Sequence, residues 1–144
     1  MIESIEKIGK LQFNPEDFNS SLYPMSEDDY NSDFAQFNNS SRQGALIEHE
    51  LIQFAKKLGW NEFIQCQVIS GFDFVGEHSD PIGKAIGCLT WIGRTRDGAT
   101  SECLLTVDED TLSLEVGDVF AFIPELTHKL SANCLWTMIV ADFE

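Results

Sequence analysis

Basic residues are scarce in this sequence. The chain has 9 Lys and Arg residues against 24 Asp and Glu residues, which gives a formal net charge of −15 at pH 7. An acidic surface on average repels phosphate backbones and anionic lipid headgroups. The composition therefore argues against nucleic acid and membranes as partners. It does not point to any substrate, because acidity of this kind also serves solubility.

Long apolar runs are also absent. The longest apolar stretches, 119–124 and 134–141, have the length of a β-strand, whereas a membrane-spanning helix needs about 20 residues. The first residues lack the basic-then-apolar pattern of a signal peptide. We therefore expect a cytoplasmic protein. A length of 144 residues predicts a single domain, with 1–59 as an N-terminal wrapping segment and helix and 60–144 as the core.

Paired cysteines are lacking as well. The four cysteines form no CxxC pair, and each lies inside or beside an apolar run. This placement favours reduced cysteines in the core, with a structural zinc site or a disulfide as the alternatives. The residues are Cys66, Cys88, Cys103 and Cys134.

The segment from Phe13 to Arg42 is polar but contains many aromatic residues. Asn, Ser, Asp and Glu dominate it, yet fully disordered segments usually have few aromatics. We expect an irregular or short-helical segment that wraps the core, with a flexible tail as the alternative. The large apolar residues spread through it are Phe13, Phe18, Leu22, Tyr23, Tyr30, Phe34 and Phe37.

One α-helix is predicted next. Ser40 and Gln43 have the spacing of a capping box, and Gly59 supplies a C-terminal stop. His49 lies on the polar side of this helix, which favours a solvated surface histidine over a ligand. The apolar residues that recur at helical spacing are Ile47, Leu51, Phe54, Ala55 and Leu58.

The second half of the chain is predicted to be all β. Short β-rich runs alternate with turn residues, and a hairpin-like turn is expected at 94–98, with a second connection at 115–118. Successive short strands with little helix between them indicate a sandwich or a jelly roll, that is, a double-stranded β-helix. The predicted strands are 63–69, 85–92, 102–107, 111–114, 119–123 and 135–143.

Three residues could hold a metal ion. His78 and Asp80 are two apart near a predicted strand end, so their side chains point to the same side of an extended chain. His128 follows the strand that ends at Pro124 and could supply a third ligand. Two His and one carboxylate form the facial triad that holds non-haem Fe(II) and leaves positions open. The alternative is a structural histidine hydrogen-bonded to Asp80, with His128 unrelated.

From about Trp60 onward the chain resembles the 2-oxoglutarate/Fe(II)-dependent oxygenases. The resemblance is carried by an apolar strand, the segment GEHSD at 76–80, three further strands, and GDVFAF at 117–122 leading to His128. It implies a jelly roll with preceding helices and Fe(II) on His78, Asp80 and His128. It also implies 2-oxoglutarate as co-substrate and hydroxylation of a small molecule or of an amino-acid or peptide side chain.

The chain departs from that family at the co-substrate site. Many members have a basic residue on the last strand that pairs with the distal carboxylate of 2-oxoglutarate, whereas 134–140 contains no base. A buried carboxylate needs a cationic partner or several donors. The remaining candidates for binding 2-oxoglutarate are Lys84, Arg94, Arg96 and Lys129.

The chain also resembles the cupins more weakly, through Gly117, Pro124, His128 and Asn133. This resemblance implies the same fold and nearly the same metal site. Two alternatives to the oxygenase therefore stay open: a cupin-type metalloenzyme that does not use 2-oxoglutarate, and a non-catalytic module that binds a ligand or partner. Exposed edge strands would also allow a homodimer.

Overall fold

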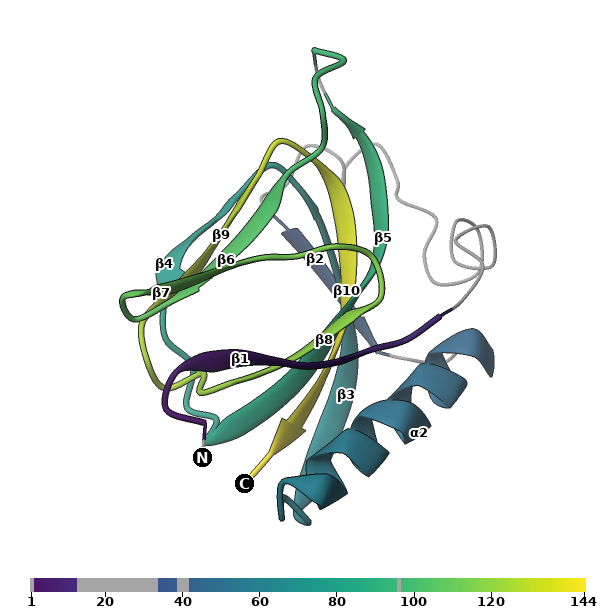
Figure 1. Ribbon diagram of the computed structural model, residues 1–144, viewed down its shortest axis with the longest axis vertical. Helices are drawn as coiled ribbons and strands as arrows, with labels where there is room; N and C mark the ends of the chain where they lie inside the picture. Colours follow the sequence, from purple (N-terminus) through teal and green to yellow (C-terminus); the bar gives the residue numbers. More distant parts are fainter. Residues whose placement is uncertain (1, 13–33, 39–41, 96) are drawn as a thin grey trace.

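The computed structural model describes residues 2–12, 34–38, 42–95 and 97–144. These ranges form a jelly-roll β-sandwich in which two antiparallel sheets face each other (Figure 1). Helix α2 (Arg42–Lys57) packs on the outer side of the larger sheet. The predicted fold class, mainly β with one preceding helix, is confirmed.

The larger sheet contains six of the described strands and the smaller sheet four. The larger runs in the order β1 (Ile5–Lys10), β8 (Asp118–Phe122), β5 (Lys84–Thr95), β10 (Cys134–Phe143), β3 (Phe63–Phe72) and β2 (Phe34–Asn38). The smaller runs in the order β4 (Val75–His78), β9 (His128–Ala132), β6 (Cys103–Val107) and β7 (Asp110–Ser113).

Strand β10 separates two hydrophobic clusters. Every residue of this strand is buried, because it lies between β5 and β3 and both of its faces are covered. Its side chains alternate between the two faces. Ile139 and Ala141 pack in the cluster beneath α2, whereas Met138 and Val140 pack in the cluster between the sheets. A strand covered on both faces accounts for the unbroken apolar run in this part of the sequence.

Helix α2 matches its predicted range closely. Leu51 and Ala55 are fully buried against the sheet, and Gly59 has a φ of 80°, the left-handed conformation that ends many helices. His49 is exposed, as predicted. Ser40, the predicted capping residue, lies outside the described residues.

Four strands and one connection differ from the sequence-based expectation. Strands β1, β2, β4 and β9 were not predicted. Strand β2 shows that part of the segment 13–42 is extended, and Arg42 begins α2; the remainder of the segment lies outside the described ranges. The turn expected at 94–98 does not form a hairpin, because β5 and β6 belong to different sheets. It passes instead from one sheet to the other, as jelly-roll connections do.

All four cysteines are free thiols, and three of them are buried. Cys88, Cys103 and Cys134 are buried, and Cys66 is half-buried. Burial, with a smaller contribution from the charge of Asp118, raises the pKa of the Cys88 thiol to about 12. Burial likewise raises the pKa of Cys103 to about 12. These thiols are therefore protonated core residues at neutral pH.

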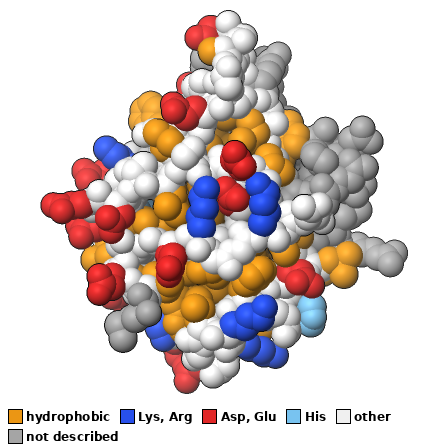
Figure 2. All heavy atoms as spheres, viewed as in Figure 1, with side chains coloured by type: hydrophobic (Ala, Val, Ile, Leu, Met, Phe, Trp, Pro, Cys, Tyr) orange, Lys and Arg blue, Asp and Glu red, His pale blue; other side chains and the backbone are white. Residues whose placement is uncertain are grey.

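The acidic surface is partly neutralised on one face. Figure 2 shows acidic side chains spread over this face and basic side chains beside acidic ones near its centre.

No helix in the described ranges has the length and apolarity needed to cross a bilayer.

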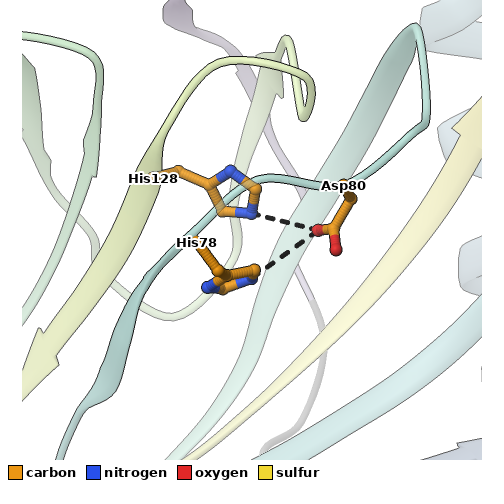
Figure 3. Close-up of side chains that lie close together, drawn as sticks. All are labelled: His78, Asp80 and His128. Carbon is orange, nitrogen blue, oxygen red and sulfur yellow. Dashed lines mark ion pairs between the residues drawn. The ribbon is translucent and has the colours of Figure 1, made fainter.

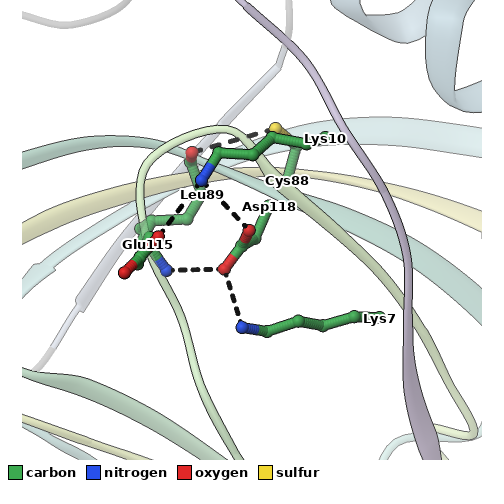
Figure 4. A network of polar contacts seen from close by, with 6 residues as sticks. All are labelled: Lys7, Lys10, Cys88, Leu89, Glu115 and Asp118. Atoms are coloured by element: carbon green, nitrogen blue, oxygen red, sulfur yellow. Dashed lines mark hydrogen bonds and ion pairs between the residues drawn. The ribbon is translucent and has the colours of Figure 1, made fainter.

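Asp118 links strand β1 to the sandwich (Figure 4). Its buried carboxylate lies 3.1 Å from the Lys7 Nζ and 3.7 Å from the Lys10 Nζ, and it accepts a 2.8 Å hydrogen bond from the backbone N–H of Glu115. At the adjacent Gly117, φ is +96°, and an added Cβ would lie 2.4 Å from the Leu11 carbonyl oxygen. The turn before β8 is therefore fixed both by charge and by the close approach of β1.

We predict that Asp118→Ala destabilises the protein by about 1–3 kcal/mol, because it leaves the Glu115 N–H without its acceptor and removes the partner of two lysines. Urea unfolding measures this change. The matched control is Glu115→Ala, which removes an exposed carboxylate from the same network and should cost less than about 1 kcal/mol. Equal effects of the two substitutions would contradict the prediction.

Candidate metal centre

His78 and His128 are brought together by strand pairing. His78 ends β4, His128 begins β9, and the two residues are direct partners in the antiparallel register. Directly opposed residues of an antiparallel pair project to the same face. Their ring centroids lie 4.3 Å apart, at an interplanar angle of 58°. The register of this pair therefore sets the spacing of the two imidazoles.

Asp80 completes the cluster just beyond the end of β4. Its backbone N–H donates a 2.9 Å hydrogen bond to the Pro124 carbonyl, which fixes the chain after the strand. Its Oδ2 lies 3.2 Å from His128 Nε2 and 3.6 Å from His78 Nε2 (Figure 3). One ligand atom from each residue lies within 4.8 Å of the others. The structure thus brings together the three residues that were predicted as ligands.

The hydrogen bonds of the two rings determine which nitrogen faces the cluster. His78 Nδ1 lies 2.7 Å from the Gly76 carbonyl oxygen, and His128 Nδ1 lies 2.9 Å from that of Leu126. A carbonyl only accepts, so each Nδ1 carries a proton. A neutral ring then presents a lone pair at Nε2. Backbone carbonyls that hold a histidine in this tautomer are typical partners of metal-ligating imidazoles.

The donor set fits a divalent metal ion. The Nε2 atoms of both rings face the same oxygen of the Asp80 carboxylate, and a neutral imidazole Nε2 and a carboxylate oxygen are both acceptors. A cation at the centre would satisfy both. Two imidazoles and one carboxylate suit Fe(II) and related first-row metals. Metal binding itself stays a prediction.

The cluster is buried on one side and open on the other. The His128 side chain is 8% exposed, whereas those of His78 and Asp80 are 40% and 43% exposed. The Phe122 ring packs edge-on against His128 with the centroids 5.5 Å apart. His128 is thus held by the core, and the open side leaves room for further ligands.

The three residues line a cavity of about 320 Å³ between the two sheets. Such a volume is at the lower end of the range for small-molecule sites. The walls are mostly apolar side chains from both sheets: Ile69, Val75, Leu105, Phe120, Phe122, Leu130, Trp136, Met138 and Val140.

Asp142 is a polar wall residue that the sequence analysis missed. It lies on β10 opposite Gln65 of β3 and is only 3% exposed. Gln65 Nε2 donates a 2.9 Å hydrogen bond to its Oδ2. Burial raises the pKa of the Asp142 carboxyl; the bond from Gln65 opposes this rise, and the negative charge of Asp80 adds to it. The cavity therefore contains a second carboxyl group besides Asp80.

Asp142 should make the metal-free protein less stable as pH rises. Its folded-state pKa is raised above the ordinary value of 3.8, so the folded state holds the proton more tightly than the unfolded state. Its contribution to the free energy of unfolding is then complete below pH 3.8 and is lost as pH rises through the folded-state pKa. Urea unfolding across this window should show wild type losing stability relative to Asp142→Asn. The prediction would be contradicted if the free energy of unfolding of wild type, relative to that of Asp142→Asn, stayed constant or increased as pH rises.

Of the bases predicted to bind 2-oxoglutarate, only Lys129 lines the cavity within the described part of the chain. Lys84 Nζ donates a 3.0 Å hydrogen bond to the Glu144 carbonyl and lies 5.9 Å from the centre of the Trp60 ring, so its amine is engaged elsewhere. Lys129 contributes to the cavity lining but is exposed and alternates with the buried His128. The Arg94 side chain and all of Arg96 lie outside the described part of the chain.

Comparison with known proteins gives no match at the level of sequence families. No protein-family model matches the chain, and no curated protein does.

Solved structures share the fold. An X-ray structure of YcfD from Escherichia coli has a TM-score of 0.57 and 14% identity, covering 85% of this chain and 37% of that one. A second structure, of YcfD as a ribosomal oxygenase in complex with cobalt and succinic acid, has a TM-score of 0.54 and 15% identity, covering 74% and 29%.

A cupin superfamily protein from Desulfitobacterium hafniense is similar at a TM-score of 0.49 and 14% identity, covering 79% of each chain. The chain spans about a third of the length of YcfD. The two YcfD structures show that the chain shares their fold, which is the common part of the two resemblances drawn from the sequence.

Proposed function

We propose that this protein is an Fe(II)-dependent oxygenase of small molecules, with the metal held by His78, Asp80 and His128. The observation that carries the proposal is the convergence of these three side chains, within 4.8 Å, on the wall of an apolar cavity between the sheets. A facial set of three ligands leaves positions for substrate and dioxygen.

The residues around the metal would each have a defined part in this reaction. His78 and His128 hold their Nε2 atoms toward the centre because their Nδ1 protons bond to backbone carbonyls. Asp80 supplies negative charge, and Phe122 keeps the His128 ring in place. The apolar walls exclude water from the bound substrate. The iron, when bound, supplies activation of dioxygen, chemistry that the side chains cannot perform themselves.

The finer form of the proposal has 2-oxoglutarate as co-substrate. It is supported by the order His-x-Asp and then a distant His, and by the similarity in fold to YcfD, which has been solved with cobalt and succinic acid. This form needs a donor for the distal carboxylate. Among the described residues of the cavity, Gln67 is a neutral side chain able to give one, whereas the Gln65 amide already donates to Asp142.

A second form, cupin-type oxygenation without a 2-oxoacid, is favoured by the charge of the cavity. Asp142 would face any dicarboxylate bound beside the metal, and Lys84 is turned away from the cavity. Like charges close together in one cavity destabilise each other. Of the two forms, the described residues fit this one better.

Anaerobic titration of Fe(II) and then 2-oxoglutarate into the apoprotein separates the two forms. A visible metal-to-ligand charge-transfer band, lost in His78→Ala, would establish the 2-oxoglutarate form. Stoichiometric iron binding without the band would favour the cupin-type form, and dioxygen uptake with candidate substrates would then be measured. Failure to bind iron would refute the proposed function and leave a non-catalytic binding module.

A further inference from the structure

The cavity has its polar groups on both sheets. His78 and His128 come from the smaller sheet, with Asp80 just beyond it, whereas Asp142 and Gln65 come from the larger sheet. Asp142 is not part of the metal-ligand cluster, because the group of mutually close ligand atoms in the described residues contains only the other three. It therefore calls for a separate explanation.

The Asp142 carboxylate lacks a cationic partner in the described part of the protein. Its one hydrogen bond there comes from the neutral amide of Gln65, and the lysines that form ion pairs bind Asp118 and Glu115 on the outer face. Lys84, on the strand next to β10, is occupied by Glu144 and Trp60. Lys129 also lines the cavity, but among the described residues it forms no ion pair with Asp142. Buried carboxylates usually persist where a charge or several donors compensate them.

We propose that the substrate carries a protonated amine, which binds Asp142 while an apolar body fills the cavity. This inference rests on the proposed function and names the chemical class of its substrate. An ammonium group supplies both the missing positive charge and hydrogen-bond donors for the carboxylate. The aromatic and aliphatic walls, among them Phe120, Trp136 and Met138, match an apolar body.

An anionic substrate fits this cavity less well. Its charge would lie in the same cavity as the carboxylates of Asp142 and Asp80, and the Gln65 amide is already engaged with Asp142. A neutral alcohol could donate one hydrogen bond but would leave the charge of Asp142 uncompensated. The order of affinity in the metal-free protein should therefore be ammonium, then alcohol, then carboxylate.

Calorimetric binding of three matched probes tests the proposal in the full-length apoprotein. The probes are 2-phenylethylammonium, 2-phenylethanol and 3-phenylpropanoate, which share one apolar body and differ in the charge of the head group. We expect the ammonium to bind roughly 10- to 100-fold more tightly than the alcohol. Asp142→Asn should abolish this preference while leaving the affinity for the alcohol unchanged.

Two control variants separate Asp142 from other nearby carboxylates. Asp80→Asn removes the other carboxylate of the cavity, and Glu77→Gln removes an exposed one beside His78. The ammonium preference should survive in Glu77→Gln, and it should fall less in Asp80→Asn than in Asp142→Asn. A preference lost in Asp80→Asn and retained in Asp142→Asn would overturn the inference, as would the absence of any preference in wild type.

A second measurement does not depend on the folding of Asp142→Asn. In wild type, nuclear Overhauser contacts should join the methylene beside the probe's ammonium to the side-chain amide protons of Gln65. Contacts to other residues alone would refute the site. Titration of Co(II) into the same samples keeps the two proposals apart. Metal binding without any preference for the ammonium probe would refute only the amine-binding role of Asp142. A preference for the ammonium probe without metal binding would refute only the metal centre.

Discussion

His128→Ala is expected to weaken Fe(II) binding by roughly 100-fold or more. Loss of a residue that only hydrogen-bonds to a metal ligand typically weakens metal binding 10- to 100-fold, and loss of the ligand itself should cost at least as much. His128 is the most buried of the three ligands, and water would replace it poorly beside Phe122. His78→Ala and Asp80→Ala should also lose stoichiometric binding. Anaerobic isothermal titration calorimetry with Fe(II), repeated with Co(II), measures the affinities.

The third histidine provides the matched control. His49 is exposed on α2, away from the cavity, so His49→Ala should bind Fe(II) as wild type does. Circular dichroism checks that every variant is folded. Tight Fe(II) binding that persists in both His128→Ala and Asp80→Ala would show that the cluster is not the metal site.

Phe120→Ala is expected to destabilise the protein by about 3–5 kcal/mol, the usual cost of removing a buried aromatic side chain. Phe120 is 1% exposed, and its ring packs directly against Gly87. A Cβ at Gly87 would lie only 2.5 Å from the ring, so the absence of a side chain there makes room for it. It also packs against Phe122, which in turn contacts His128. The substitution should therefore weaken metal binding as well as stability.

Urea unfolding of the apoprotein measures the first effect and Co(II) titration the second. Phe74→Ala is the control, because Phe74 is 61% exposed and its removal should change stability by less than about 0.5 kcal/mol. Equally small effects of the two substitutions on stability would contradict the tight packing of Phe120 described above.

Much of the fold could be predicted because its signals are local. The helix was found from apolar residues at helical spacing and from Gly59, and β10 from a long apolar run. The three ligands were found because His78 and Asp80 are two apart and histidines are few. Strands β4 and β9 were missed because they are short and carry Gly76 and Lys129 among few apolar residues.

The rest of the site depends on contacts between distant parts of the chain. Asp142 faces the cavity because β10 pairs with both β3 and β5, which a local pattern does not reveal. One signal was present: Trp136, Met138, Val140 and Asp142 alternate along one strand, so a carboxylate is predicted on the cavity face once that face is known. Lys84 was a candidate by position, but its amine turns toward Glu144.

An anomalous difference map from crystals grown with Co(II) tests the metal centre most directly. We predict one strong peak about 2.0–2.2 Å from the Nε2 atoms of His78 and His128 and from an Asp80 carboxylate oxygen, the usual range for such bonds. A peak elsewhere on the protein, or no peak while the Nε2 atoms keep their present contacts with Asp80, would contradict the assignment of these residues as ligands.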